Sequence, residues 1–179
     1  NGGKAYIMAS AERAKSMREP PVYLLGWGEC NNASSGPRYR ANPLITGITQ
    51  AGKRAFEMAG VTHKDIRCLN LYDDYIPIVM IQIEHLGFCG RNDKAFFERT
   101  DFTFKGDLPI QTSGGMINCG QPSTTGGMLH VIETVRQIRG EAGDRQVPNI
   151  KFGISTGVGA VNYGKNFGCT AAAILGSAA

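Results

Sequence analysis

The residues best suited to chemistry lie in the sequence Tyr72-Asp73-Asp74-Tyr75, which combines two phenols with two carboxylates. The apolar segment before it predicts a strand and the segment after it predicts a helix, so these side chains are expected where open α/β sheets bind their ligands. A phenol beside a helix N-terminus can donate a hydrogen bond, and the helix dipole can lower its pKa. Tyr72 could therefore act as a general acid or an oxyanion donor. Asp73 and Asp74 have the simpler alternative of capping the helix.

A second candidate is the segment 113–127, where glycines and hydroxyl side chains are too dense for a plain connection. This density indicates that some group approaches the backbone closely. The segment could cradle a phosphate, present backbone N–H groups to an oxyanion, or pack tightly against the sheet. It contains neither a Walker pattern nor G-x-G-x-x-G, so a nucleotide site is not supported. A third glycine-rich stretch, 153–160, could line the same cleft or form a bent hairpin, and we favour the hairpin.

Charge and hydropathy exclude several classes of protein. The 179 residues include 19 Lys and Arg against 15 Asp and Glu, and this net charge of +4 is too small to indicate a nucleic-acid partner. No run approaches the roughly 18–20 apolar residues of a membrane-spanning helix. The first residues lack both a signal-peptide pattern and an initiator Met, so the chain is expected to belong to a longer protein.

The five cysteines form no C-x-x-C pair and have no histidine at ligand spacing. This pattern argues against a zinc site and against a disulfide framework. We therefore assign no metal ligand and expect a reducing, cytoplasmic setting.

The elements that must position the candidate groups alternate between strands and helices. Apolar runs predict five strands, at residues 5–10, 22–27, 67–72, 150–155 and 170–175. Helical spacing predicts helices at residues 11–17, 43–59, 76–86 and 128–139. Gly60 and Gly140 are placed to end two of these helices. This order predicts an α/β fold with a mixed five-stranded sheet and helices on both faces.

Two segments carry further expectations. Residues 88–108 follow no period and predict a surface excursion that packs on the body through Phe96, Phe97 and Phe102. The apolar residues of the last helix mark one of its faces, namely Met128, Val131, Ile132, Val135 and Ile138.

Taken in this order, the three candidate stretches resemble the carboxyl-terminal half of the thiolase superfamily and are most similar to its sterol-carrier-protein-like, lipid-transfer branch. Residues 58–66 and 136–143 add to the likeness, the latter because Gln137-Ile138-Arg139-Gly140-Glu141-Ala142-Gly143 is similar to the family's QLRGEAG helix exit. The resemblance covers nearly the whole chain. It implies a thiolase-like layered fold, with residues 1–17 ending the amino-terminal half and 18–179 forming the carboxyl-terminal domain.

The resemblance also implies the catalytic positions. Ordinary thiolases carry Asn-Glu-Ala-Phe or His-Asp-Cys-Phe where this chain has 72–75, and Gly-His-Pro where it has 120–122. In the family these motifs form an oxyanion hole for the thioester oxygen, and a Cys or His near the last glycines moves a proton at the α-carbon. The matching positions here are Tyr72, Gln121 and Ser155. Substrate-binding residues are expected at Asp73, Ser113, Gly114, Gly115, Ser123 and Gly157.

All three catalytic positions depart from the standard pattern. Gln121 can still donate a hydrogen bond from its amide, but it cannot carry a proton at neutral pH as imidazole can. Proton transfer is therefore expected to move to Tyr72, whose ordinary pKa near 10 needs lowering or a partner such as Asp73 or Gln121.

The resemblance implies further partners. The nucleophilic cysteine of the family lies in the amino-terminal half, so none of the five cysteines here is expected to be the nucleophile, including Cys119 beside Gln121. A coenzyme A thioester is the implied substrate, and no permanently bound cofactor is expected. A homodimer or higher oligomer through the missing half is implied, as is a small partner protein that combines a zinc ribbon and an OB fold.

Three functions remain open on the sequence. The first is an acyltransferase of lipid metabolism that makes or breaks a C–C bond in an acyl-CoA thioester by acyl transfer. This chain would be the carboxyl-terminal half of that enzyme. The second is a retro-aldol lyase acting on a β-hydroxyacyl-CoA. The third is a non-catalytic module for assembly or lipid binding, favoured by Gln121 and by the lack of a Cys or His near Ser155.

Overall fold

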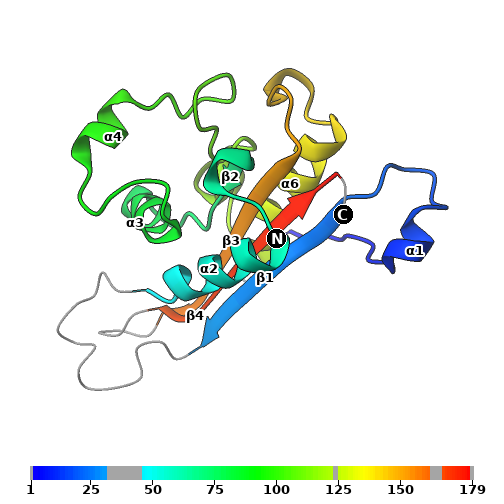
Figure 1. The fold of residues 1–179 in the computed structure, drawn as a ribbon, viewed down its shortest axis with the longest axis horizontal. Coiled ribbons are helices and arrows are strands. Elements are labelled where there is room, and N and C mark those ends of the chain that lie inside the picture. Colours follow the sequence, from blue (N-terminus) through cyan, green and yellow to red (C-terminus); the bar gives the residue numbers. More distant parts are fainter. Residues whose placement is uncertain (1, 32–45, 123–124, 162–166, 178–179) are drawn as a thin grey trace.

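A computed structural model describes residues 2–31, 46–122, 125–161 and 167–177 of the chain. Four strands form one mixed sheet in the order β1-β4-β3-β2, namely β1 (Tyr23–Asn31), β2 (Ile66–Asn70), β3 (Phe152–Val161) and β4 (Phe167–Gly176). β4 pairs antiparallel with β1 and with β3, whereas β2 and β3 are parallel (Figure 1). The predicted α/β fold with a mixed sheet is confirmed, with four strands among the described residues in place of the five expected.

The strand expected at residues 5–10 is the one that the sheet lacks. That segment is exposed, Ile7 at 86% and Met8 at 75%, and it pairs with no described strand. An apolar run has the composition of a strand but does not specify a partner for its backbone, so the prediction was wrong. At the edge of the sheet formed by β2, Ile110 forms an isolated parallel bridge with Leu69.

Six α-helices accompany the sheet in the described residues: α1 (Ala11–Ala14), α2 (Ile48–Ala59), α3 (Ile76–Leu86), α4 (Lys94–Arg99), α5 (Gly115–Cys119) and α6 (Met128–Arg139). Gly60 and Gly140 end α2 and α6 in the left-handed conformation, as the sequence predicts. The first helix stops three residues earlier than expected, at Ala14. Of the helix predicted at 43–59, residues 43–45 lie outside the described residues, and α2 begins at Ile48 rather than before Gly47, its N-cap.

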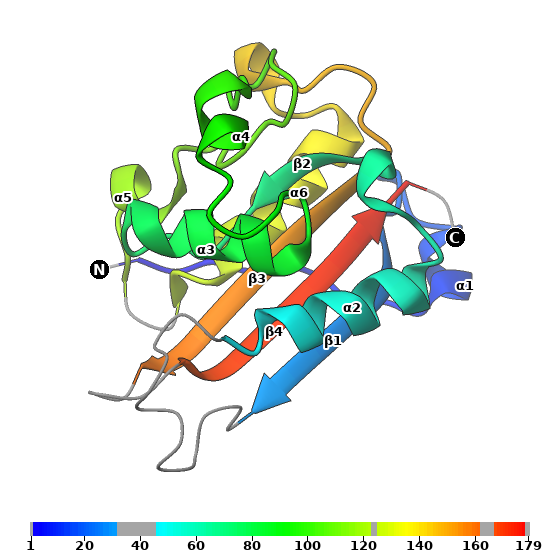
Figure 2. The same cartoon turned by 60° about the vertical axis from the view of Figure 1, so that its left-hand side comes forward.

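Helices cover both faces of the sheet (Figure 2). On one face, α2 packs so closely that a Cβ at Gly26 or Gly28 would overlap its backbone. The neighbouring α3 reaches that same face through Gln82, which bonds Thr156 of β3. Ser155 precedes Thr156 in the strand and therefore points to the opposite face, where its hydroxyl contacts α6. The prediction of helices on both faces is confirmed.

The most buried face of α6 is polar. Its predicted apolar face is only half-buried, whereas the residues buried against the sheet are Leu129, His130, Glu133, Thr134 and Gln137. Three of those five side chains, Glu133, Thr134 and Gln137, are hydrogen-bonded inside the protein, so α6 is held by a defined polar network as well as by apolar contact.

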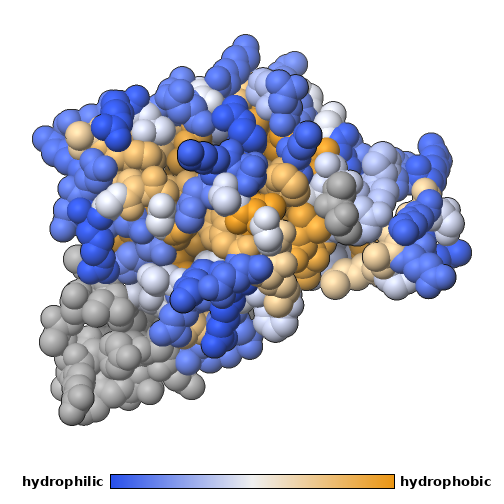
Figure 3. Space-filling model, in the orientation of Figure 1, coloured by the Kyte–Doolittle hydropathy of each residue, from blue (hydrophilic) through white to orange (hydrophobic). Residues whose placement is uncertain are grey.

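The excursion at 88–108 packs as expected. Phe96, Phe97 and Phe102 contact one another with ring centroids 5.4–6.1 Å apart, and all three pack on the main core. Other large apolar side chains stay exposed, and Figure 3 shows apolar surface in the middle of one face of the molecule, bordered by hydrophilic residues.

Candidate active site

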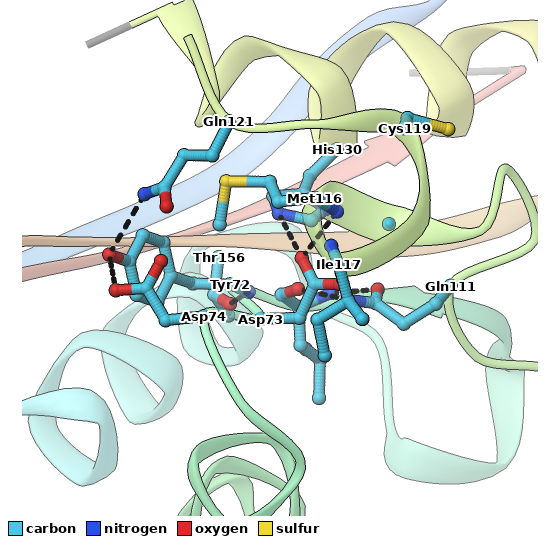
Figure 4. Close-up of polar contacts among 12 residues, drawn as sticks. Tyr72, Asp73, Asp74, Gln111, Met116, Ile117, Cys119, Gln121, His130 and Thr156 are labelled. Atoms are coloured by element: carbon cyan, nitrogen blue, oxygen red, sulfur yellow. Dashed lines mark hydrogen bonds and ion pairs between the residues drawn. The ribbon is translucent and has the colours of Figure 1, made fainter. Parts of the chain in front are cut away.

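Tyr72 and Gln121, separated by 49 positions in the sequence, meet in the structure (Figure 4). Tyr72 follows the end of β2 and is 8% exposed, whereas Gln121 lies two residues beyond the end of α5 and is exposed. The amide Nε2 of Gln121 donates to the Tyr72 hydroxyl at 3.4 Å. The hydroxyl in turn donates to the Asp74 carboxylate at 2.5 Å. A phenol, a carboxylate and an amide therefore form one chain of hydrogen bonds.

The backbone around Tyr72 is held by side chains from three other elements. Its N–H donates to the hydroxyl of Thr156 on β3, and that hydroxyl donates to Gln82 of α3. Gln82 closes the ring by donating to the Tyr72 carbonyl at 2.7 Å. One residue earlier, Leu71 exchanges two hydrogen bonds with the side chain of Gln111. The phenol thus projects from a backbone segment that is fixed on both sides.

Burial raises the pKa of Tyr72 to about 12, and the hydrogen bond to Asp74 and the negative charge of that carboxylate act in the same direction. The hydrogen bond from Gln121 opposes them more weakly. The expectation that the helix dipole lowers this pKa was wrong, because desolvation and a nearby anion both disfavour a phenolate. The sequence suggested Asp73 or Gln121 as the partner of the phenol. Gln121 does bond the phenol, whereas the carboxylate that bonds it is Asp74 and not Asp73. Tyr72 is a neutral hydrogen-bond donor at neutral pH.

Asp73 points away from the phenol and into the protein. It does not cap α3, whose N-cap is Tyr75 with no side-chain hydrogen bond, and Asp74 does not cap it either. The Asp73 carboxylate instead accepts from the backbone N–H groups of Met116 at 2.9 Å and Ile117 at 3.3 Å, in the first turn of α5. Its side chain is almost fully buried, and Nε2 of His130 lies 3.3 Å from Oδ1.

The glycine-rich loop owes part of its composition to this carboxylate. Gly114 and Gly115 have φ angles of 95° and 66°, which favour glycine, and a Cβ at Gly115 would overlap Oδ2 of Asp73. The predicted close approach to the loop backbone is therefore confirmed, and one group that approaches is an aspartate of the protein itself. Ser113 is half-buried, and its hydroxyl accepts from the Gly115 N–H. Ser123 lies outside the described residues.

Ser155 lies on the opposite face of the sheet from Thr156. It is 2% exposed, and its hydroxyl bonds the Thr134 hydroxyl and the His130 carbonyl beneath α6. Gly157, the next residue after Thr156, is half-buried opposite Ala171 of β4. The stretch forms one strand of a hairpin, as favoured from the sequence. Of the three predicted catalytic residues, the structure joins Tyr72 to Gln121 and places Ser155 in the polar network under α6.

Sequence reasoning missed Thr156, Gln82 and Gln111, which hold the backbone of the site. The signal available for Thr156 was strand alternation: in β3 only one of two neighbouring residues can face the Tyr72 loop. Gln82 and Gln111 act on backbone groups, and no pattern in the sequence marks that role.

The start of the glycine-rich loop has a second anchor. The Thr112 hydroxyl donates to Oε1 of the buried Glu133 at 2.8 Å, and Arg145 bonds both that oxygen and the Thr112 carbonyl at 2.6 Å. The loop is therefore fixed at Thr112 by α6 and at α5 by Asp73.

Metal-binding clusters and membrane-spanning helices are both absent from the described ranges. These ranges hold no group of three or more His, Cys, Asp or Glu side chains arranged to bind a metal ion. None of the helices placed in them has both the length and the apolar character needed to cross a membrane.

Comparison with known proteins gives a consistent result. The sequence pattern of the family described as thiolase C-terminal domain-like matches residues 32–175. A steroid side-chain-cleaving aldolase of Thermomonospora curvata is 32% identical over 171 residues, which cover 88% of this chain and 41% of the relative. An acetyl-CoA acetyltransferase of Methanothermobacter thermautotrophicus is 30% identical over 161 residues, covering 89% and 42%. Sterol carrier protein 2 of Oryctolagus cuniculus is 34% identical over 165 residues, covering 89% and 30%.

The solved structures agree with the sequence relatives. A chain of the Ltp2-ChsH2(DUF35) aldolase structure superposes with a TM-score of 0.75 at 27% identity, covering 93% of this chain and 42% of that one. The chain spans about two fifths of the length of the aldolase and the acetyltransferase that it matches.

Proposed function

Because the chain belongs to the thiolase C-terminal domain-like family, in its sterol-carrier-protein-2-like branch, we propose that the full-length protein is an enzyme acting on an acyl-coenzyme A thioester. We propose further that it cleaves a β-hydroxyacyl-CoA by a retro-aldol reaction. The observation that carries the proposal is the neutral phenol of Tyr72, held between the Asp74 carboxylate and the Gln121 amide. The steroid side-chain-cleaving aldolase among the relatives supports this choice of reaction.

The three side chains match the needs of this reaction. The β-hydroxyl loses its proton, the bond between the α- and β-carbons breaks, and its electron pair forms an enolate of the thioester. Protonation at the α-carbon then gives a shorter acyl-CoA, and the other product is a ketone or an aldehyde. In our proposal Asp74 takes up the hydroxyl proton through Tyr72 and returns it by the same route to the α-carbon. Gln121 donates a hydrogen bond to the enolate oxygen.

Two features of the site support these roles. Oδ2 of Asp74 accepts from Tyr72, whereas the buried Oδ1 has no hydrogen-bond partner among the described residues, so the carboxylate retains a free acceptor. Gln121 is exposed, and its 3.4 Å contact with Tyr72 is long, so the amide is available to an incoming carbonyl.

The second candidate is acyl transfer, which the acetyl-CoA acetyltransferase relative favours. This reaction needs a nucleophilic cysteine, which we place outside this chain. In that case Tyr72 and Gln121 would stabilise the thioester oxygen, and Tyr72 would protonate the leaving carbanion. The two reactions differ in one observable, because acyl transfer passes through an acyl-cysteine and retro-aldol cleavage does not.

The test uses the full-length protein with β-hydroxyacyl-CoA substrates, with the shorter acyl-CoA followed by mass spectrometry. Tyr72→Phe removes the hydroxyl and is expected to lower kcat by about 10²–10³-fold. Tyr23→Phe is the matched control, because Tyr23 begins β1, at the edge of the sheet opposite to β2, and it should leave kcat unchanged. Unchanged turnover in Tyr72→Phe would remove Tyr72 from the chemistry, and a trapped acyl-cysteine would replace lyase with acyltransferase. A protein that turns over none of these substrates but still assembles would indicate a non-catalytic module.

We also propose that the full-length protein assembles as a homodimer or higher oligomer and works with a small zinc-ribbon and OB-fold protein. The aldolase structure that the chain resembles is named with a second component, ChsH2(DUF35), and this supports a partner of that kind. Light scattering of the purified protein, with and without a co-expressed candidate partner, measures both assemblies. A monomer whose mass stays unchanged would contradict both.

A further inference from the structure

We infer that Asp73 is a positioning residue for this site, and that it acts by holding α5 so that Gln121 reaches the hydroxyl of Tyr72. The inference rests on the proposed function, because it assigns Asp73 a role in the same reaction. Asp73 and Tyr72 are consecutive residues, and their side chains contact opposite ends of one short segment, Gly115–Gln121.

Direct chemistry by Asp73 is excluded by its surroundings. The side chain is 3% exposed, so no substrate reaches it in this structure. Its Oδ1 accepts from the Met116 N–H and lies near His130, and its Oδ2 accepts from the Ile117 N–H. Both oxygens are therefore engaged, and any influence on the reaction must pass through what they hold.

What they hold is the start of α5, a helix of only five residues. Gly120 ends it with a φ of 89°, and Gln121 follows at once. A helix this short has little stability of its own, so its position depends on tertiary contacts. A carboxylate that accepts from N–H groups of the first turn is a strong anchor, because those groups have no partner within the helix.

The residue at 115 gives an independent sign that this contact is built into the sequence. A Cβ there would overlap Asp73 Oδ2, and the φ of 66° is one that side chains disfavour. Glycine at this position lets the carboxylate come within hydrogen-bond reach of the next two N–H groups. The anchor thus uses a matched pair, an aspartate on one loop and a glycine on the other.

His130 connects the anchor to the body of the protein. It lies in the first turn of α6 with its side chain 1% exposed, and its Nε2 approaches Asp73 Oδ1 at 3.3 Å. Its carbonyl accepts from Ser155 and Thr134. The buried ring of His130 therefore lies directly against Asp73, on the carboxylate that holds α5.

The test compares Asp73→Asn, Gln121→Ala and the double variant in the full-length protein. An Asn oxygen can replace only one of the two acceptors, so α5 should shift and kcat should fall roughly 10–100-fold, with KM changed less than about threefold. If Asp73 acts through Gln121, then Asp73→Asn should change kcat by less than about threefold once Gln121 is already Ala. Equal factors in both backgrounds, or an unchanged kcat, would overturn the inference.

Asp65→Asn is the matched control. Asp65 also accepts from a backbone N–H at the start of a short helix, that of Thr62, but it precedes β2, whereas Tyr72 and Asp73 follow the other end of that strand. It should lower the melting temperature and leave kcat unchanged. If Asp73→Asn does not fold, Gly115→Ala serves as a second variant, because its methyl group would displace α5 from the carboxylate while Asp73 itself is kept. Gly115→Ala should lower kcat in the same way, and this effect should likewise disappear once Gln121 is already Ala.

A readout without turnover separates this inference from the proposed function. In a crystal structure of Asp73→Asn, the distance from Gln121 Nε2 to the Tyr72 hydroxyl should exceed its present 3.4 Å. An unchanged distance would refute the positioning role even if the enzyme proves active. A lengthened distance in a protein that turns over no β-hydroxyacyl-CoA would uphold the positioning role and refute the proposed reaction.

Discussion

At the scale of single residues, the site is set by which way neighbouring side chains point. Tyr72 and Asp73 are consecutive residues, yet the phenol turns to Asp74 and Gln121 and the carboxylate turns to α5. Residue types alone pointed to Tyr72, and the family resemblance added Gln121. They could not predict that Asp74 rather than Asp73 would pair with the phenol, because both aspartates carry the same group and only the backbone path distinguishes them.

The pair Ser155 and Thr156 shows the same limit. The resemblance placed the third polar position at Ser155, but the hydroxyl that bonds the Tyr72 backbone belongs to Thr156. In a strand, a shift of one residue moves a side chain to the other face of the sheet. A motif match near a glycine-rich stretch can be displaced by one residue, and in a strand that displacement selects the wrong face of the sheet.

The raised pKa of Tyr72 predicts an abnormal titration. An ordinary tyrosine ionises near pH 10, whereas Tyr72 should ionise near pH 12, because burial and Asp74 oppose the phenolate. Subtracting the alkaline absorbance titration at about 295 nm of Tyr72→Phe from that of wild type isolates this group. Below pH 10 Tyr72 is neutral in both folded and unfolded chains, so it adds no pH dependence there. Between pH 10 and 12 only the unfolded chain ionises, so stability should fall. A difference curve centred near pH 10 would contradict the assignment.

At the scale of elements, local signals set the ends of helices, and long-range contacts set what the helices bury. Gly60 and Gly140 predicted two helix ends, because a left-handed C-terminal residue is a local requirement. The buried face of α6 was not predictable in this way. Its apolar residues suggest one face, but the polar residues Glu133 and Thr134 are buried because their partners lie on other elements, at Arg145 and Ser155.

The anchor between α6 and the glycine-rich loop predicts a clear effect on stability. Arg145→Met removes the partner of the buried Glu133 carboxylate and should lower the free energy of unfolding by about 3 kcal/mol. We take the lower end of the usual range for broken buried pairs, because the Arg145 side chain is 40% exposed and partly screened. Arg139→Met is the control, since the guanidinium of Arg139 bonds one exposed carbonyl, and it should change stability by less than about 1 kcal/mol. Urea unfolding measures both, and equal losses would show that the pair is not an anchor.

At the scale of the whole molecule, the spacing between layers depends on glycine in β1. A sheet and a helix normally stand apart by the length of their side chains, but α2 lies directly on the backbone at Gly26 and Gly28. No pattern in the sequence assigns these two glycines to a helix contact, because the atoms that a side chain there would overlap belong to α2, a separate segment of the chain.

Gly28→Ala tests this layer contact. The new methyl group would overlap the Ala51 carbonyl, so α2 must lift, and the free energy of unfolding should fall by about 3 kcal/mol. Gly90→Ala is the control, because no atom lies near its Cβ position and its φ is not positive. Thermal unfolding of the two variants should give a large loss for the first and a small change for the second. Similar melting temperatures would mean that the layers tolerate the methyl group.

The central place of β3 has a consequence for how the protein matures. The N–H of Tyr72 is held by Thr156, a partner 84 positions later in the chain, and the parallel pairing of β2 with β3 closes a loop of similar length. Such distant closure is slow, because much chain entropy is lost before any contact repays it. During translation, α2 and α3 can form while the phenol still lacks this support. The hydrogen bonds around Tyr72 are therefore completed only after β3 has left the ribosome. A nascent chain that ends before β3 contains the sequence 72–75 but lacks the contacts that position Tyr72.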